Sequence, residues 1–139
     1  MQFFVECINM LVEVGCLAWS VVLGLVHILV AGNSRTKDLG AQWNMGARDG
    51  ESGPLRPLTG RLLRAQSNFF ETFPLFAIAI LLVAVTNSFS VYSYWGAILY
   101  LIARVVYLPL YAFGIPLIRS LVWLVSIAGL LMVLVPLLF

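Results

Sequence analysis

The stretch Gly60–Phe76, GRLLRAQSNFFETFPLF, decides the fold of this chain. It begins with basic residues, becomes polar and ends apolar, as expected of a helix that starts outside a membrane and then enters it. Arg64, Asn68 and Glu71 stand at i, i+4 and i+7, so a cation, an amide and a carboxylate share one narrow stripe. Burying such groups at membrane depth costs on the order of several kcal/mol unless they pair or bind a polar ligand. The stripe therefore indicates either an Arg–Glu pair between helices or a ligand site.

The composition around this stretch is that of a membrane protein. Hydrophobic residues make up 62% of the 139 residues and charged residues only 10%, far from the balance of a soluble domain. This length accommodates about four spans of roughly 20 residues and one long loop. The net charge of +2 gives no indication of a nucleic-acid partner. We therefore expect an all-α, membrane-spanning four-helix bundle with antiparallel neighbours, formed by a single domain over residues 1–139.

Four apolar segments and one polar segment define the expected organisation. The segment 32–60 contains six glycines, two prolines and half of the charged residues, which predicts a loop. The spans are expected at about Phe3–Ala31, Arg61–Asn87, Tyr92–Gly114 and Leu117–Leu138.

The first span carries its polar residues on one side. They recur at steps of three, four or seven, which places them on one helix face that should point into the bundle rather than at lipid. His27 is expected to be a packing residue, because the chain has a single histidine, and no metal site is expected. The polar set is Glu6, Asn9, Glu13, Cys16, Ser20 and His27.

Basic residues predict the orientation in the membrane. They gather between the first two spans and at the turn before the last one, whereas the opposite ends of the spans carry no Lys or Arg. The positive-inside rule places the 32–60 loop in the cytoplasm and both termini on the opposite side of the membrane. The basic residues are Arg35, Lys37, Arg48, Arg56, Arg61, Arg64 and Arg119.

The four spans bring polar groups to this basic end. Arg35, Arg64, Arg104 and Arg119 face one nearby carboxylate, Glu71, which leaves an excess of positive charge. Guanidinium groups bind carboxylates through two parallel hydrogen bonds, so the excess predicts an anionic ligand that carries carboxylates. The alternative is that several arginines extend to lipid phosphates. Further polar groups on the third and fourth spans are Tyr107, Tyr111 and Ser120.

Two segments resemble the MAPEG superfamily, the membrane-associated proteins in eicosanoid and glutathione metabolism. They are RLLRAQSNFFETFP at 61–74 and YLIARVVYLPLYAFGIPLIRSLVW at 100–123, and WNMGARDG at 43–50 is similar to the bacterial branch. The resemblance implies a homotrimer in a bacterial inner membrane, in contact with lipid, with glutathione as co-substrate in clefts between neighbouring subunits. It also implies a glutathione-dependent transferase or peroxidase that acts on lipophilic electrophiles.

The resemblance further assigns roles to residues of this chain. Arg64, Asn68 and Glu71 match positions that hold glutathione, and a larger set falls where the family makes further contacts. Arg119 and Ser120 match the position that stabilises the thiolate. Gln66 and Tyr107 stand where some family members have histidine, and Trp123 where one has tyrosine. These departures favour conjugation or peroxide reduction over isomerase chemistry. The further contacts implied are Arg35, Arg104, Tyr107, Tyr111 and Arg119.

Two other functions are consistent with the residues. One is a non-catalytic accessory or structural subunit that keeps the MAPEG fold and belongs to a larger membrane complex. The other is a proton-coupled exporter, which Glu13 in the first span suggests but the long glycine-rich loop disfavours.

Overall fold

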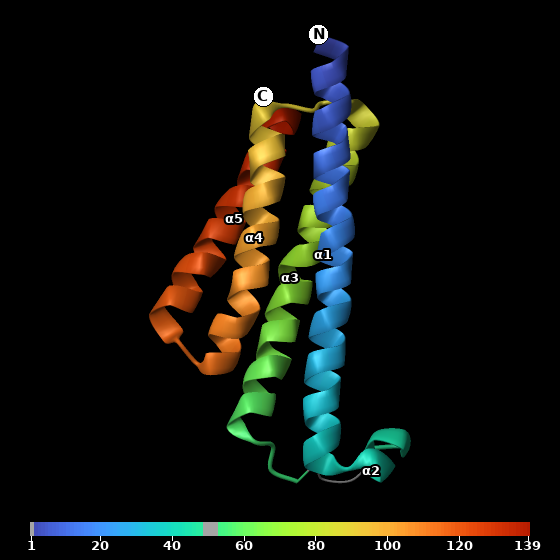
Figure 1. Ribbon diagram of the computed structural model, residues 1–139, viewed down its shortest axis with the longest axis vertical. Coiled ribbons are helices and arrows are strands. Elements are labelled where there is room, and N and C mark those ends of the chain that lie inside the picture. The colour runs from blue at the N-terminus through green and yellow to red at the C-terminus, as the bar shows by residue number, and fades with distance from the viewer. Residues whose placement is uncertain (1, 49–52) are drawn as a thin grey trace.

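The protein is all-helical over the residues that the computed structural model describes, 2–48 and 53–139, with side chains described from residue 12 onward. Four long helices and one short helix follow one another (Figure 1). Their bounds are α1 Gln2–Leu39, α2 Ala41–Met45, α3 Pro57–Thr86, α4 Val91–Phe113 and α5 Pro116–Leu138. The four long helices contain segments long and apolar enough to cross a membrane, as the sequence predicts.

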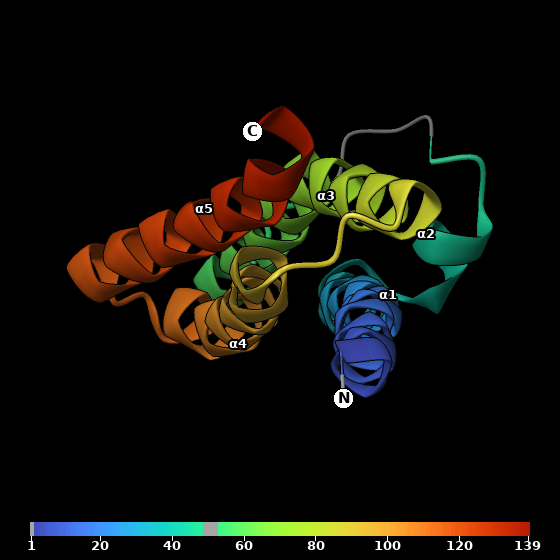
Figure 2. The same cartoon turned by 90° about the horizontal axis from the view of Figure 1, so that it is seen from above.

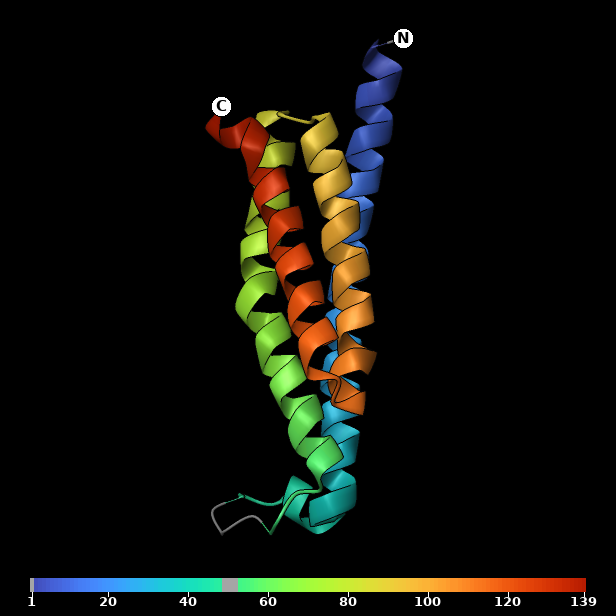
Figure 3. The ribbon, with the colours of Figure 1, turned by 90° about the vertical axis from the view of Figure 1, so that its left-hand side faces the viewer.

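The long helices pack side by side along a common direction (Figures 2 and 3). At the lower end in Figure 1, α1 ends, α2 turns sideways and α3 begins; we call this the basic end. The turn between α4 and α5 lies toward the same end but less far along the bundle, so α1 and α3 extend beyond it. The turn between α3 and α4 lies at the other end, beside the C-terminus.

The expected loop 32–60 is partly helical. α1 continues through the polar residues to Leu39, and after Gly40, which has φ +87°, the short α2 follows. Contacts with α3 explain the extension: the Ser34 and Thr59 hydroxyls lie 2.6 Å apart, and Asp38 forms an ion pair with Arg56. Tertiary contacts therefore fix a polar segment as helix where composition alone predicts a loop.

The polar stripe of α1 points into the bundle, as predicted. Glu13, Ser20 and His27 are all at most 1% exposed, whereas Trp19 and Leu29 on other sides of the helix are 65% and 63% exposed. Cys16 is also buried and is a free thiol. Glu6 and Asn9 lie outside the residues whose side chains are described. Apolar residues therefore face the lipid, and polar ones face the other helices.

Two glycines allow α4 and α5 to approach each other closely. A Cβ added to Gly96 would lie 2.6 Å from the Gly129 carbonyl oxygen, and one added to Gly129 would lie 2.8 Å from the Gly96 oxygen. Below this crossing the core contains Tyr100, whose ring stacks on Phe76 of α3 with 3.9 Å between ring centres. This packing sets the separation of the helices that carry the site described next.

Candidate functional site

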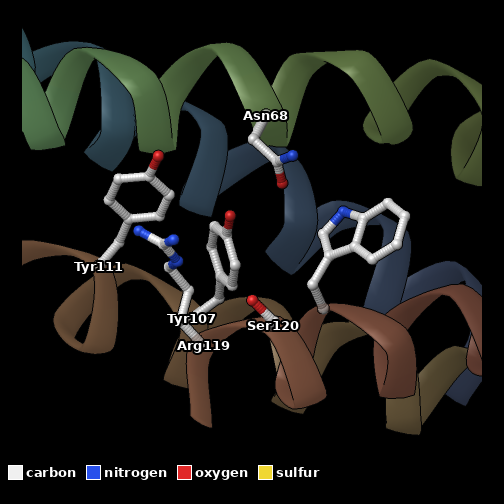
Figure 4. A pocket seen from close by; sticks show the side chains of 6 residues that line it. Asn68, Tyr107, Tyr111, Arg119 and Ser120 are labelled. Carbon is white, nitrogen blue, oxygen red and sulfur yellow. The ribbon is translucent and has the colours of Figure 1, made fainter. Parts of the chain in front are cut away.

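A polar cavity of about 180 Å³ opens between α3, α4 and α5, toward the basic end (Figure 4). It is lined by one residue from α3, two from α4 and three from the first turns of α5. Five of the six are residues that the sequence singled out as candidates. The lining residues are Asn68, Tyr107, Tyr111, Arg119, Ser120 and Trp123.

The tight turn between α4 and α5 explains why both helices contribute residues to this cavity. Tyr107 and Tyr111 stand one helical turn apart, and their rings contact edge to face with 5.4 Å between centres. Three residues after Tyr111, Gly114 adopts φ +75°, which ends α4, and α5 begins two residues later at Pro116. This tight reversal places the first turns of α5 beside the last turns of α4, so the two tyrosines meet Arg119 (Figure 4).

Arg119 supplies the positive charge of the cavity. Its guanidinium carbon lies 4.3 Å from the centre of the Tyr111 ring, a cation–π contact that holds the side chain against α4. Over the part of the chain with described side chains, Arg119 makes no hydrogen bond and no ion pair. Its N–H donors are therefore available to a ligand in the cavity.

The other lining groups differ in what they can offer. The Ser120 hydroxyl donates to the Pro116 carbonyl at 3.1 Å, which leaves its lone pairs free but occupies its proton. The indole Nε1 of Trp123 is buried without a hydrogen-bond partner among the described residues, and an indole nitrogen can only donate. The cavity lining includes a cation and several donors but no carboxylate, so it suits an anion or a ligand rich in acceptors.

Arg104 lies behind the cavity rather than in it. The residue is fully buried, and its Nη1 donates to the Asn68 Oδ1 at 2.8 Å while its Nη2 donates to the Thr72 hydroxyl. The rings of Tyr100 and Tyr107 lie on either side, 5.6 and 5.5 Å from the guanidinium carbon. Because Arg104 occupies the amide oxygen of Asn68, the amide N–H groups remain for a ligand. Arg104 therefore positions Asn68.

The remaining candidates lie outside this cavity. Arg35 of α1 contacts Trp43, with 5.5 Å from its guanidinium carbon to the ring centre. Arg64 and Glu71 are exposed on α3, and Glu71 accepts a hydrogen bond from Ser67 at 3.4 Å. The structure shows no Arg64–Glu71 ion pair; over the described residues the one ion pair joins Arg56 to Asp38. A single chain thus brings together five candidates and leaves Arg64 and Glu71 exposed and Arg35 half-buried, with Arg104 in the core.

One buried group near the site, Thr72, was not predicted, whereas His27 was expected to be a packing residue. Thr72 links Arg104 to Tyr100, whose hydroxyl lies 3.2 Å away, and its position one residue after Glu71 was the only available signal. His27 packs on Phe69, as expected of a packing residue, with ring centres 4.8 Å apart. Neither of its ring nitrogens has a hydrogen-bond partner within the described part of the chain.

The contact between Arg104 and Asn68 leads to a prediction about stability. Asn68→Leu should lower the free energy of unfolding by about 1–3 kcal/mol, because it removes an acceptor from a buried charge. Adding Arg104→Met should restore much of that loss, since both polar partners are then gone. Thermal unfolding of the four proteins of this double-mutant cycle in detergent would measure the coupling. Additive effects would show that the contact contributes nothing.

Comparison with known proteins assigns the chain to a family. The family model for the MAPEG family matches residues 16–139, which is nearly the whole chain and includes every residue of the cavity. No curated protein and no solved structure matches the chain. Together with the four apolar helices, the match identifies a multi-pass membrane protein.

Proposed function

Because the chain belongs to the MAPEG family, we propose that it is a glutathione-dependent transferase or peroxidase that acts on lipophilic electrophiles. The observation that supports this most directly is the cavity beside Arg119, which offers a guanidinium and several hydrogen-bond donors without a carboxylate. Glutathione carries two carboxylates and several carbonyl oxygens, so its chemistry matches this lining. A neutral or cationic ligand would leave the guanidinium unpaired.

The size of the cavity favours an assembly in which a neighbour completes the site. At about 180 Å³ the cavity is smaller than the roughly 300 Å³ at which ligand pockets usually begin. Arg64 and Glu71 are exposed on the same helix as Asn68, and Arg35 lies near the basic end. We propose that the antiparallel four-helix subunits form a homotrimer in which these three residues contact glutathione together with the cavity of an adjacent subunit.

The proposed chemistry begins with the thiol of glutathione. A free thiol has a pKa of about 8.5 and is mostly protonated at neutral pH, whereas a nearby guanidinium favours the thiolate. The thiolate sulfur then attacks an electrophilic carbon, and the leaving group departs with the bonding electrons. With a hydroperoxide, the sulfur attacks the O–O bond and releases an alcohol, and a second glutathione reduces the resulting sulfenic acid to a disulfide and water.

The exposed apolar surface indicates how the electrophile reaches this site. Leu121 and Leu124, beside the cavity residues of α5, are 54% and 56% exposed, which in a membrane means contact with lipid. A lipophilic substrate can therefore enter from the bilayer. We further propose that the protein lies in the inner membrane of a bacterial cell, with its basic end facing the cytoplasm. Soluble glutathione would then enter the site from the cytoplasm.

Thermal stabilisation by glutathione tests this proposal. A ligand that binds only the folded protein adds about 2.7 kcal/mol of stability at a concentration of 100 Kd. We expect glutathione to raise the unfolding temperature of the detergent-solubilised protein, and Arg64→Ala to abolish most of this rise. Arg48→Ala is the matched control, because Arg48 is also an exposed arginine but its hydrogen bonds go to Asn44.

Equal loss of stabilisation in both variants would indicate a general charge effect and contradict the assignment of Arg64. If neither glutathione nor another natural thiol stabilised the protein, and no turnover of an aromatic halide or lipid hydroperoxide were found, the enzymatic function would be wrong. The chain would then be a non-catalytic member of its family.

A further inference from the structure

A second cavity, of about 350 Å³, lies between the end of α1 and the beginning of α3, away from the site beside Arg119. It has an apolar part and a basic part. The apolar lining is formed by Val30, Leu58 and Leu62, and the polar lining by Asn33, Ser34, Lys37 and Arg56. None of these seven residues takes part in the proposed glutathione chemistry.

The two parts of the cavity are separated along the bundle axis. α1 ends and α3 begins at the basic end, so later residues of α1 and earlier residues of α3 lie farther out (Figure 1). Val30 and Lys37 are seven residues apart, which corresponds to about 10 Å along a helix. Leu62 and Arg56 are six residues apart, or about 9 Å. The cavity therefore has Val30 and Leu62 at its inner end and the two cations at its outer end, where Leu58 also lies.

The outer end lies at the level expected for lipid phosphates. The guanidinium of Arg61 lies against Gly114 in the turn between α4 and α5, and its Nε donates to the Pro57 carbonyl at 3.3 Å, so this turn lies at the depth of the first turn of α3. Phe113 and Leu117 in the same turn are 78% and 72% exposed, which places the hydrocarbon region at this depth. Arg56 comes just before this first turn of α3, so it lies farther out than the α4–α5 turn, toward the headgroup layer, which is about 5–8 Å thick on each side of a bilayer.

Contacts between the two helices hold the cavity open. The Ser34 and Thr59 hydroxyls join its walls at 2.6 Å, and the Asp38 carboxylate binds both the backbone N–H of Arg56, at 2.9 Å, and its side chain. The Asp38 side chain is only 2% exposed, whereas that of Arg56 is 59% exposed and Lys37 is exposed as well. The accessible charge at the mouth is therefore positive although one carboxylate lies nearby.

From this arrangement we infer that the cavity binds an anionic phospholipid. Its phosphate would contact Lys37 and Arg56, its glycerol and ester groups would lie near Asn33, and an acyl chain would cover the apolar inner end. A phosphatidylcholine would bind less well, because its quaternary ammonium would lie beside the two cations. Basic pockets between membrane helices are a known way to bind such headgroups. The inference does not depend on the proposed glutathione chemistry.

Native mass spectrometry of the delipidated full-length protein in a neutral detergent tests this inference. We expect phosphatidylglycerol to bind more tightly than phosphatidylcholine with the same acyl chains. Lys37→Gln should weaken phosphatidylglycerol binding about fivefold, from the loss of one cation near the phosphate. Lys37→Arg should retain the affinity, and Asn33→Asp, which adds a carboxylate to the lining, should lower it.

Arg48→Gln serves as the matched control, since it removes an exposed cation that does not line the cavity. Equal weakening by Lys37→Gln and Arg48→Gln would show that only the general charge of the surface attracts the lipid. Inorganic phosphate or glycerol 3-phosphate that displaced the lipid with equal affinity would show a site for free phosphate instead. Equal affinities for the two lipids would also overturn the inference.

Discussion

Replacing Arg119 with leucine is expected to lower kcat/KM for glutathione conjugation by about 100-fold or more at pH 7. The loss of one preorganised donor to a developing anion typically costs about 10²–10³ in rate. Arg119 is the cation of the cavity, and it makes no hydrogen bond that would occupy its donors within the described residues. Steady-state kinetics with an aromatic halide would measure the effect, with the thermal stability of each variant measured alongside.

The pH dependence separates thiolate stabilisation from simple binding. A cation beside the sulfur lowers the pKa of the bound thiol, so the native protein should keep its rate as the pH falls from 8.5 to 7. Without the cation the pKa of the bound thiol moves back toward about 8.5. The rate of the Arg119→Leu variant should therefore rise steeply as the pH increases from 7 to 8.5. A pH profile with the same shape in both proteins would contradict this role of Arg119.

The Ser120→Ala variant tests which residue stabilises the thiolate, because the sequence leaves Arg119 and Ser120 as equal candidates for that role. The Ser120 hydroxyl donates to the Pro116 carbonyl, so its proton is not available to a thiolate without a change of rotamer. We therefore expect Ser120→Ala to change the rate much less than Arg119→Leu. A larger loss with Ser120→Ala would assign thiolate stabilisation to the hydroxyl and show that the cation only binds the ligand.

The second large effect is expected at the crossing of α4 and α5. Gly96→Ala should destabilise the protein by about 3 kcal/mol or more, the upper part of the range for overpacking. The added Cβ would lie 2.6 Å from the Gly129 carbonyl oxygen and 2.9 Å from the Val133 nitrogen. These are backbone atoms, so the two helices would have to separate. Thermal unfolding in detergent, followed by circular dichroism, would measure the loss.

Gly32→Ala is the matched control for this change. Gly32 is also a helical glycine, but a Cβ at that position meets no atom within 4 Å. Alanine there should be neutral or stabilising by up to about 1 kcal/mol, because it is the better helix former. If both variants had the same stability, α4 and α5 would not pack as closely as the structure shows. Loss of glutathione turnover in Gly96→Ala would further indicate that this crossing holds Tyr111 and Arg119 in register.

Much of the fold could be predicted because it depends on local properties of the chain. Apolar runs of about 20 residues determine the four spans, since unsatisfied backbone groups in lipid can be avoided only by helices or closed barrels. The seven-residue spacing of Glu13, Ser20 and His27, about two helical turns, determines which face of α1 is buried. Proline and glycine mark the turn between α4 and α5 in the sequence itself.

The site could be predicted only in part, because periodicity specifies a helix face but not what lies opposite it. Arg104 and Arg119 are both arginines near aromatic residues, yet packing against α3 buries the first and leaves the second in the cavity. Trp123 lines the cavity because the turn at Gly114 sets the rotation of α5 relative to α4. Which candidates share one subunit's cavity therefore depends on helix depth and rotation.

The sequence by itself determined a four-span membrane protein of one family, with an excess of cations at one end. Hydropathy, residue spacing and short motifs depend only on residues that are close together in the sequence. Only the tertiary structure decided that α1 extends as a helix to Leu39, that Arg104 holds Asn68, and that Lys37 and Arg56 share a second cavity. Each of these depends on contacts between residues at least 18 positions apart in the chain. Such contacts form only when the helices pack, so local sequence patterns do not specify them.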